Sequence, residues 1–179
     1  GVPITTEACP HHWALTDAAV EDSSYDTHTK MHPPLRTAAD VQAIKDGLAD
    51  GTIDVIATDH APHAGFEKEV EFIEAPFGIL GLETCWGLTV RDLVRPGVLT
   101  LAQAVHKLAV APREILGLDV PTLEVGAEAN LTVFDDSTEW TFEQRHIRSK
   151  SHNTPFVGAP MVGRAWAIVN RGQWVEAEA

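Results

Sequence analysis

Apolar and polar positions near the start of the chain predict a strand, a helix and a second strand. Residues 38–49 place apolar side chains on one helical face, follow a T-x-x-D capping sequence that begins at Thr37, and end before Gly51. On either side, residues 2–8 and 53–57 are rich in β-branched side chains, which predicts strands. This order is the βαβ unit of an α/β protein, whose ligand sites gather at the C-terminal ends of the strands.

Two polar stretches interrupt this pattern. Residues 9–36 and 60–78 lack a sustained period and contain several prolines, so both are expected to be long loops, and the second is expected to be mobile over a site. Helical spacing returns at residues 79–94. A second capping sequence at Thr100 predicts a further helix, and a last helical piece is expected over residues 112–117.

From residue 122 onward the helical spacing is replaced by short apolar runs. The last two runs flank a Gly-containing turn at residues 170–172, which predicts a hairpin in a small antiparallel sheet. The sequence thus indicates an α/β fold with two domains, residues 1–120 and residues 121–179. The expected strands are residues 130–134, 139–142, 165–169 and 173–175.

Composition and charge narrow the class of protein. Apolar residues make up 44% and charged residues 22%, as in folded globular chains, and neither a membrane helix nor a signal peptide is visible. The net charge of −13 disfavours nucleic acid and anionic membranes and favours small molecules and proteins as partners. Two cysteines without a CxxC pair point to the reducing cytoplasm. Because Gly1 leads directly into an apolar stretch, we expect that the beginning of the chain is missing.

The sequence TDHAPH follows the second predicted strand and carries the first candidate chemistry. Asp59 lies between that strand and two histidines, His60 and His63. Carboxylate and imidazole groups suit zinc or another divalent ion, and a ligating carboxylate can also take a proton from water. The alternative is that Asp59 caps the next turn, with two histidines in solvent beside it. Spacing alone leaves both interpretations open.

The other histidines and Cys9 have less specific settings. His11 and His12 are adjacent, and neighbouring residues of an extended segment point to opposite faces, so turn or packing roles are favoured over a metal site. His28 and His32 lie in a Pro-rich loop and are expected at the surface or beside a substrate. No neighbour of Cys9 would clearly lower its pKa, so it is expected to be a small buried residue.

Five motifs together resemble the bacterial dihydroorotases of the amidohydrolase superfamily, over a span from Gly1 to about Val175. DGTIDVIATDHAPH is the most specific of them, whereas EACPHH is also similar to dihydropyrimidinases and allantoinases. The motifs are EACPHH, KMHPPLRT, DGTIDVIATDHAPH, EAPFGILGLET and KSHNTPFVG.

The resemblance implies the C-terminal segment of a (β/α)8 barrel with part of a small β-rich domain. The implied activity is the zinc-dependent interconversion of dihydroorotate and N-carbamoyl-L-aspartate in pyrimidine biosynthesis. A full barrel takes about 250 residues, so this chain would supply only its last two strands. One or two Zn²⁺ ions are implied, with most ligands in the missing N-terminal half. The segment alone is therefore expected to be inactive.

Single residues also take roles from the resemblance. Asp59 matches a zinc-bound carboxylate that acts as general base, and His63 matches a substrate-binding histidine. Phe77 and Gly78 match a pair on the following loop that contacts the substrate. His32 stands where the family usually has Asn, which replaces an amide that both donates and accepts by an imidazole. The family motif around His11 and His12 lies outside the metal shell.

Two alternatives to this function remain at this point. The first is a catalytically silent dihydroorotase-like subunit that assembles with aspartate carbamoyltransferase, against which the presence of Asp59 and His63 argues. The second is an allantoinase or dihydropyrimidinase. The expected partners are a small-molecule substrate, the N-terminal half of the same enzyme, and a second copy or aspartate carbamoyltransferase.

Overall fold

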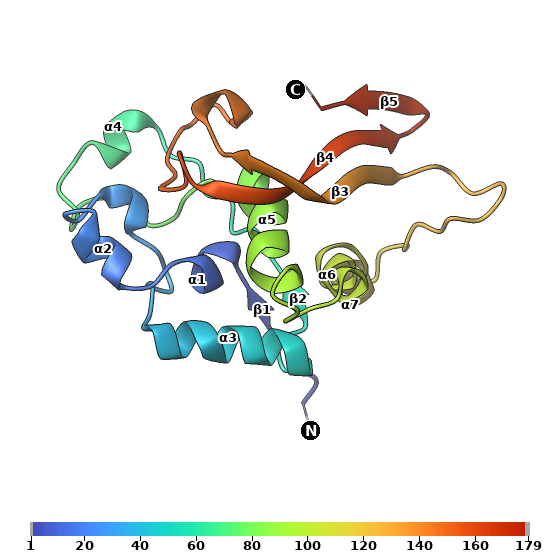
Figure 1. Ribbon diagram of the computed structural model, residues 1–179, viewed down its shortest axis with the longest axis horizontal. Coiled ribbons are helices and arrows are strands. Elements are labelled where there is room, and N and C mark those ends of the chain that lie inside the picture. Colours follow the sequence, from blue (N-terminus) through green and yellow to red (C-terminus); the bar gives the residue numbers. More distant parts are fainter. Residues whose placement is uncertain (1, 178–179) are drawn as a thin grey trace.

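The computed structural model describes residues 2–177 and confirms the predicted βαβ order. The two strands are parallel, and the helix between them begins at a capping box formed by Thr37 and Asp40. It ends at Gly51, whose φ of 87° is the left-handed conformation that glycine adopts most readily. The unit consists of β1 (Glu7–Ala8), α3 (Ala38–Asp50) and β2 (Val55–Ile56), shown in Figure 1.

Both strands are shorter than the predicted ranges 2–8 and 53–57. At their start the carboxylate of Asp54 accepts a hydrogen bond of 2.7 Å from the backbone N–H of Thr6. The N–H of Thr6 is therefore bound by a side chain, whereas in a longer β1 it would donate to the backbone of the neighbouring strand. The described residues before β1 are exposed, so their apolar character alone does not extend the sheet.

The prediction of a loop over residues 9–36 is wrong in part, because this stretch contains three short helices. Each has only three to five residues, which is too short to reveal a period of 3.6 in the sequence. Packing stabilises the first of them, whose Trp13 is 2% exposed. The helices are α1 (Pro10–Ala14), α2 (Ala18–Asp22) and the 3₁₀-helix η1 (Thr27–Thr29).

The segment after β2 is helical where the spacing predicts it, with two differences. The helix predicted from Ile79 begins only at Leu82, because Ile79 forms a parallel bridge with His60. Residues 60–78, which the sequence predicts to be a loop, contain one short helix. The capping box at Thr100 and the left-handed Gly117 are confirmed. The helices are α4 (Gly65–Lys68), α5 (Leu82–Thr89) with a π-helical turn η2 (Val90–Val94), α6 (Leu101–Val105) with a π-helical turn η3 (His106–Val110), and α7 (Ala111–Leu116).

The C-terminal part is a three-stranded antiparallel sheet in the order β3-β4-β5. Two of the predicted runs, residues 130–134 and 139–142, belong to one strand, whose register shifts twice against its neighbour. The predicted hairpin is confirmed, and its turn residues Arg171 and Gly172 both have positive φ, as a tight hairpin turn requires. The elements are β3 (Leu131–Thr141), the 3₁₀-helix η4 (Gln144–His146), β4 (Pro160–Asn170) and β5 (Gln173–Glu176).

Helix α5 connects the two parts of the molecule. Figure 1 shows it near the centre, with β3 and β4 crossing it. Gly87 of α5 lies so close to β4 that an added Cβ would be 3.0 Å from the Cβ of Met161. One buried cluster therefore includes residues from both sides of the predicted boundary at residue 120, among them Leu80, Leu88 and Phe142. Within residues 2–177 no helix is long and apolar enough to span a membrane.

Candidate functional site

Asp59 follows the C-terminal end of β2, as the sequence predicts. Its φ of 47° is left-handed, a conformation that non-glycine residues hold at a strain of roughly 1 kcal/mol or more and that clusters at functional sites. The residue is exposed, and among the described residues its carboxylate has no hydrogen-bond or ion-pair partner. The alternative interpretation, a capping aspartate, requires such a hydrogen bond. The carboxylate is therefore available to a ligand.

His60 has a different role from the one its position in TDHAPH suggests. Its Nδ1 accepts hydrogen bonds from the backbone N–H groups of Gly81 (3.1 Å) and Leu82 (3.3 Å). The neutral ring then carries its proton on Nε2, which lies 3.2 Å from the hydroxyl of Ser149. That hydroxyl donates to Glu83 at 2.8 Å. Because both ring nitrogens are occupied, His60 positions the start of α5 and is not available as a metal ligand.

The substrate-binding residues expected from the resemblance lie together. The Nε2 of His63 donates to the carbonyl of Phe77 at 2.9 Å, and the rings of His32 and Phe77 are 5.2 Å apart. Gly78 has a φ of 101°, and a Cβ there would lie 2.6 Å from the Cβ of Ala61, so only glycine fits without strain. Residues from three separate segments of the sequence thus converge on one short loop.

Asn153 is a member of this group that the sequence reasoning missed. Its side chain is buried, accepts from the backbone N–H of His63 (3.1 Å), and donates to the carbonyls of Ala61 (2.8 Å) and Gly78 (3.3 Å). It joins the strand-end segment to the loop at residues 77–78. The sequence signal was present in the motif KSHNTPFVG, but nothing local in that motif indicates what the amide binds.

Two lysines, also missed from the sequence, anchor the same loop. Lys30 donates to the carbonyls of Ile73 and Ala75, both at 2.7 Å, and its ammonium lies 4.8 Å from the centre of the Phe77 ring. Lys68 is buried and donates to the carbonyl of Pro76 at 2.7 Å. Burial, together with the charge of Lys30, lowers the pKa of Lys68 to about 8. Backbone carbonyls take the place of the carboxylate partners that buried ammonium groups usually have.

From its place at the strand end, the carboxylate of Asp59 is expected to face the same cavity as His63, and this stays a prediction. A cavity of about 530 Å³ lies elsewhere, between α5 and the three-stranded sheet, and neither residue lines it. Its wall includes Trp86, Trp140 and Arg164.

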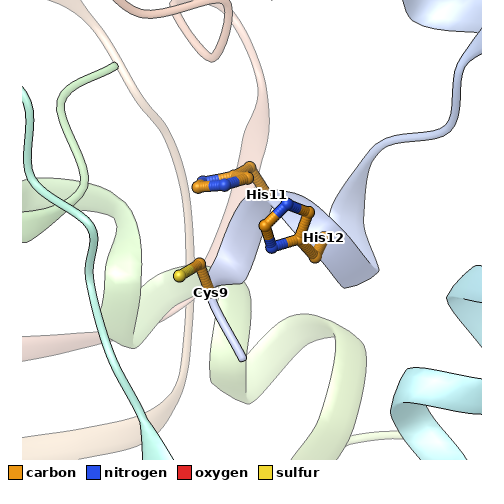
Figure 2. Close-up of side chains that lie close together, drawn as sticks. All are labelled: Cys9, His11 and His12. Carbon is orange, nitrogen blue, oxygen red and sulfur yellow. The ribbon is translucent and has the colours of Figure 1, made fainter. Parts of the chain in front are cut away.

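Cys9, His11 and His12 form a compact group at the start of α1, shown in Figure 2. The expectation that adjacent histidines point to opposite faces is wrong, because this segment is helical and the two ring centres are 4.2 Å apart. Cys9 is buried, as predicted, and burial together with the charge of Asp59 raises its pKa to about 12. Burial, and then the neighbouring His12, lowers the pKa of His11 to about 3, so its ring is neutral.

Comparison with known proteins identifies the family of the chain. The model of the amidohydrolase family matches residues 9–165. The dihydroorotases of Pelotomaculum thermopropionicum and Citrifermentans bemidjiense are 51% and 53% identical to the chain over 175 residues. These matches cover 98% of the chain but 40% and 41% of the relatives, so the chain spans about two fifths of their length.

Solved structures extend the likeness to the fold. The L-hydantoinase (dihydropyrimidinase) from Arthrobacter aurescens aligns with a TM-score of 0.87 at 28% identity, over 96% of this chain and 39% of that one. The inactive dihydroorotase-like domain of the Chaetomium thermophilum CAD-like multifunctional protein aligns with a TM-score of 0.66 at 18% identity, over 97% and 44%. The chain belongs to the amidohydrolase family.

Proposed function

We propose that this chain is the C-terminal part of a metal-dependent dihydroorotase, which interconverts dihydroorotate and N-carbamoyl-L-aspartate. The main support for this proposal is that about half of the residues are identical to those of dihydroorotases, in alignments that cover 98% of the chain. In this proposal residues 1–120 close a (β/α)8 barrel and residues 121–179 belong to a small β-rich domain. The enzyme is placed in the cytoplasm, where the free thiols Cys9 and Cys85 remain reduced.

Asp59 is proposed to be both a metal ligand and the general base. A bound Zn²⁺ would polarise the scissile amide and make water more acidic. Asp59 fits that role because its carboxylate is exposed and unpartnered among the described residues. It would take one proton from the attacking water and deliver it to the ring nitrogen as the C–N bond breaks, which balances the reaction. A catalytic zinc usually has three protein ligands, so the N-terminal half of the enzyme must supply the others.

The loop beside Asp59 is proposed to bind the substrate. The ring of His63 is held at both nitrogens, because Nε2 donates to the carbonyl of Phe77 and Nδ1 lies 3.8 Å from a carboxylate oxygen of Glu67, so it would present an oriented imidazole to the substrate. His32 and the half-exposed ring of Phe77 present a further surface. The N–H of Gly78 already donates to the backbone carbonyl of Lys30, and its carbonyl accepts from Asn153, so Gly78 would contribute its shape and the second lone pair of that carbonyl.

Turnover by the complete enzyme tests this function. We expect hydrolysis of dihydroorotate, its loss in Asp59→Asn, and near-normal rates in the matched control Asp136→Asn, which changes an exposed aspartate in β3. The amide of Asn cannot take the proton. A near-normal rate in Asp59→Asn would remove the assigned base.

Two other functions have specific observations in their favour. The likeness to L-hydantoinase keeps a hydrolase of other cyclic amides as a candidate, and a panel that compares dihydroorotate, dihydrouracil, hydantoin and allantoin would identify it. The likeness to an inactive dihydroorotase-like domain supports a second candidate, a catalytically silent subunit that assembles with aspartate carbamoyltransferase. Such a subunit would co-purify with the transferase, would not hydrolyse dihydroorotate and would contain no catalytic metal. A homodimer is the simpler assembly, and light scattering would detect it.

A further inference from the structure

The group of Cys9, His11 and His12 contains the donor set of a zinc site. One ligand atom from each residue lies within 4.8 Å of the others. Around a tetrahedral Zn²⁺ with its usual bond lengths, sulfur and nitrogen donors are roughly 3.5 Å apart. The donors must therefore approach one another by up to about 1.3 Å to surround one ion. Figure 2 shows both rings and the sulfur at the same end of α1.

The hydrogen bonding of His12 prepares its ring for a metal. Its Nε2 lies 3.1 Å from the carbonyl oxygen of Pro33, which can only accept, so Nε2 carries the proton. The lone pair of the neutral ring is then on Nδ1. Histidines that bind metals characteristically donate their other ring N–H to a carbonyl or carboxylate in this way, which fixes the tautomer and the orientation of the ring.

His11 provides a second and independent indication of a ligand. The residue is 2% exposed, and its Nε2 is buried without a hydrogen-bond partner among the described residues. A buried polar atom without a partner destabilises a fold by about 1–3 kcal/mol. Coordination of an ion, directly or through reorientation of the ring, would satisfy such an atom.

The chemistry of Cys9 selects the class of ion. Hard cations such as Mg²⁺ prefer oxygen ligands, whereas a thiolate with two imidazoles favours Zn²⁺ and softer ions. Binding replaces the S–H bond by a sulfur–metal bond and releases the proton to solvent, without oxidation or reduction. The nearby charge of Asp59, which disfavours an isolated thiolate, attracts a divalent cation to the same place.

We propose that Cys9, His11 and His12 form a binding site for one thiophilic divalent cation, Zn²⁺ or Cd²⁺, at the start of α1. The site does not use Asp59 as a ligand and does not rest on the proposed function. Water would complete the tetrahedral shell, since His12 is only partly buried and provides access from solvent.

Cd²⁺ titration of the purified protein tests the site. Near-ultraviolet absorption from sulfur-to-cadmium charge transfer detects only ions with a thiolate ligand, so a metal held by carboxylates and histidines elsewhere does not contribute. We expect the absorption to saturate at one equivalent and to disappear when excess Zn²⁺ displaces Cd²⁺. Cys9→Ser should abolish the absorption, whereas the control Cys85→Ser, which removes the other buried thiol, should retain it.

A second variant keeps the test decisive if Cys9→Ser fails to fold. His12→Gln retains a donor for the carbonyl of Pro33 and should weaken Cd²⁺ binding at least tenfold, while His28→Gln, an exchange outside the group, should not. Circular dichroism checks that each variant is folded. The proposal is overturned if no sulfur-to-metal absorption develops, if it persists in Cys9→Ser, or if His12→Gln binds Cd²⁺ as tightly as the unchanged protein.

Discussion

Gly81→Ala is expected to be among the most damaging single-methyl substitutions in the chain. Gly81 precedes α5 and lies against the backbone at the end of β2. A Cβ at this position would be 2.1 Å from the carbonyl oxygen of Thr58 and 3.0 Å from its carbon. Ordinary contacts begin near 3.4 Å, so the two segments must separate by more than about 1 Å. The φ of Gly81 is −126°, so the effect is steric and not conformational.

The magnitude follows from what this separation disrupts. Overpacking in a closely packed region typically lowers stability by about 1–3 kcal/mol. The shift would also weaken the two hydrogen bonds that His60 accepts at the start of α5, each worth about 1 kcal/mol. We therefore expect the free energy of unfolding to fall by roughly 3–5 kcal/mol. That is a large part of the 5–15 kcal/mol that typically stabilises a domain.

Urea unfolding followed by circular dichroism measures this loss. The matched control is Gly65→Ala in α4, where an added Cβ meets only a Glu69 oxygen at 3.5 Å. In a helix this exchange should be neutral or stabilising by up to about 1 kcal/mol, because alanine has the higher helix propensity. Equal midpoints for the two variants would refute the reasoning, since they would show that the close approach of Gly81 to Thr58 has no energetic consequence.

Three further predictions concern the loop and buried groups, and a fourth concerns activity. Asn153→Ala should lower the free energy of unfolding by about 2–3 kcal/mol in urea, because it leaves one buried and two partly buried backbone groups without their side-chain partner; a loss below 0.5 kcal/mol would contradict this. Lys68→Met should speed amide hydrogen exchange in residues 69–78, which its ammonium anchors; unchanged exchange would show that the anchor is dispensable. The pKa of His11 is lowered to about 3, so the unfolded state binds a proton first and stability should fall as pH decreases from about 6.5 toward 3. With chelator present, His11→Gln should flatten that pH dependence of the urea midpoint, and an unchanged slope would exclude His11 as its source. Residues 1–179 alone should not hydrolyse dihydroorotate at any zinc concentration, because one predicted ligand cannot hold a catalytic zinc; turnover above a metal-only control would reveal an unrecognised site.

The sequence by itself determined the elements whose signals are local. Helix α3 has its capping residues and its left-handed glycine within one short segment, and the β4–β5 hairpin has its turn residues between two apolar runs. Such features depend on a few neighbouring residues, so they can be predicted without knowledge of the fold. The same holds for Asp59, because a carboxylate directly after a buried strand is placed at the strand end by chain connectivity.

Tertiary structure decided the contacts between distant segments. Asn153 binds the backbone of His63 across 90 positions of sequence, and the ring of His60 is occupied by groups 21, 22 and 89 residues away. The short helix α1, which packing stabilises, brings the ring centres of His11 and His12 to 4.2 Å from each other. Local patterns do not contain these relations, because the hydrogen bonds and burial that create them exist only after the chain has brought β1, β2 and the loop at residues 77–78 together.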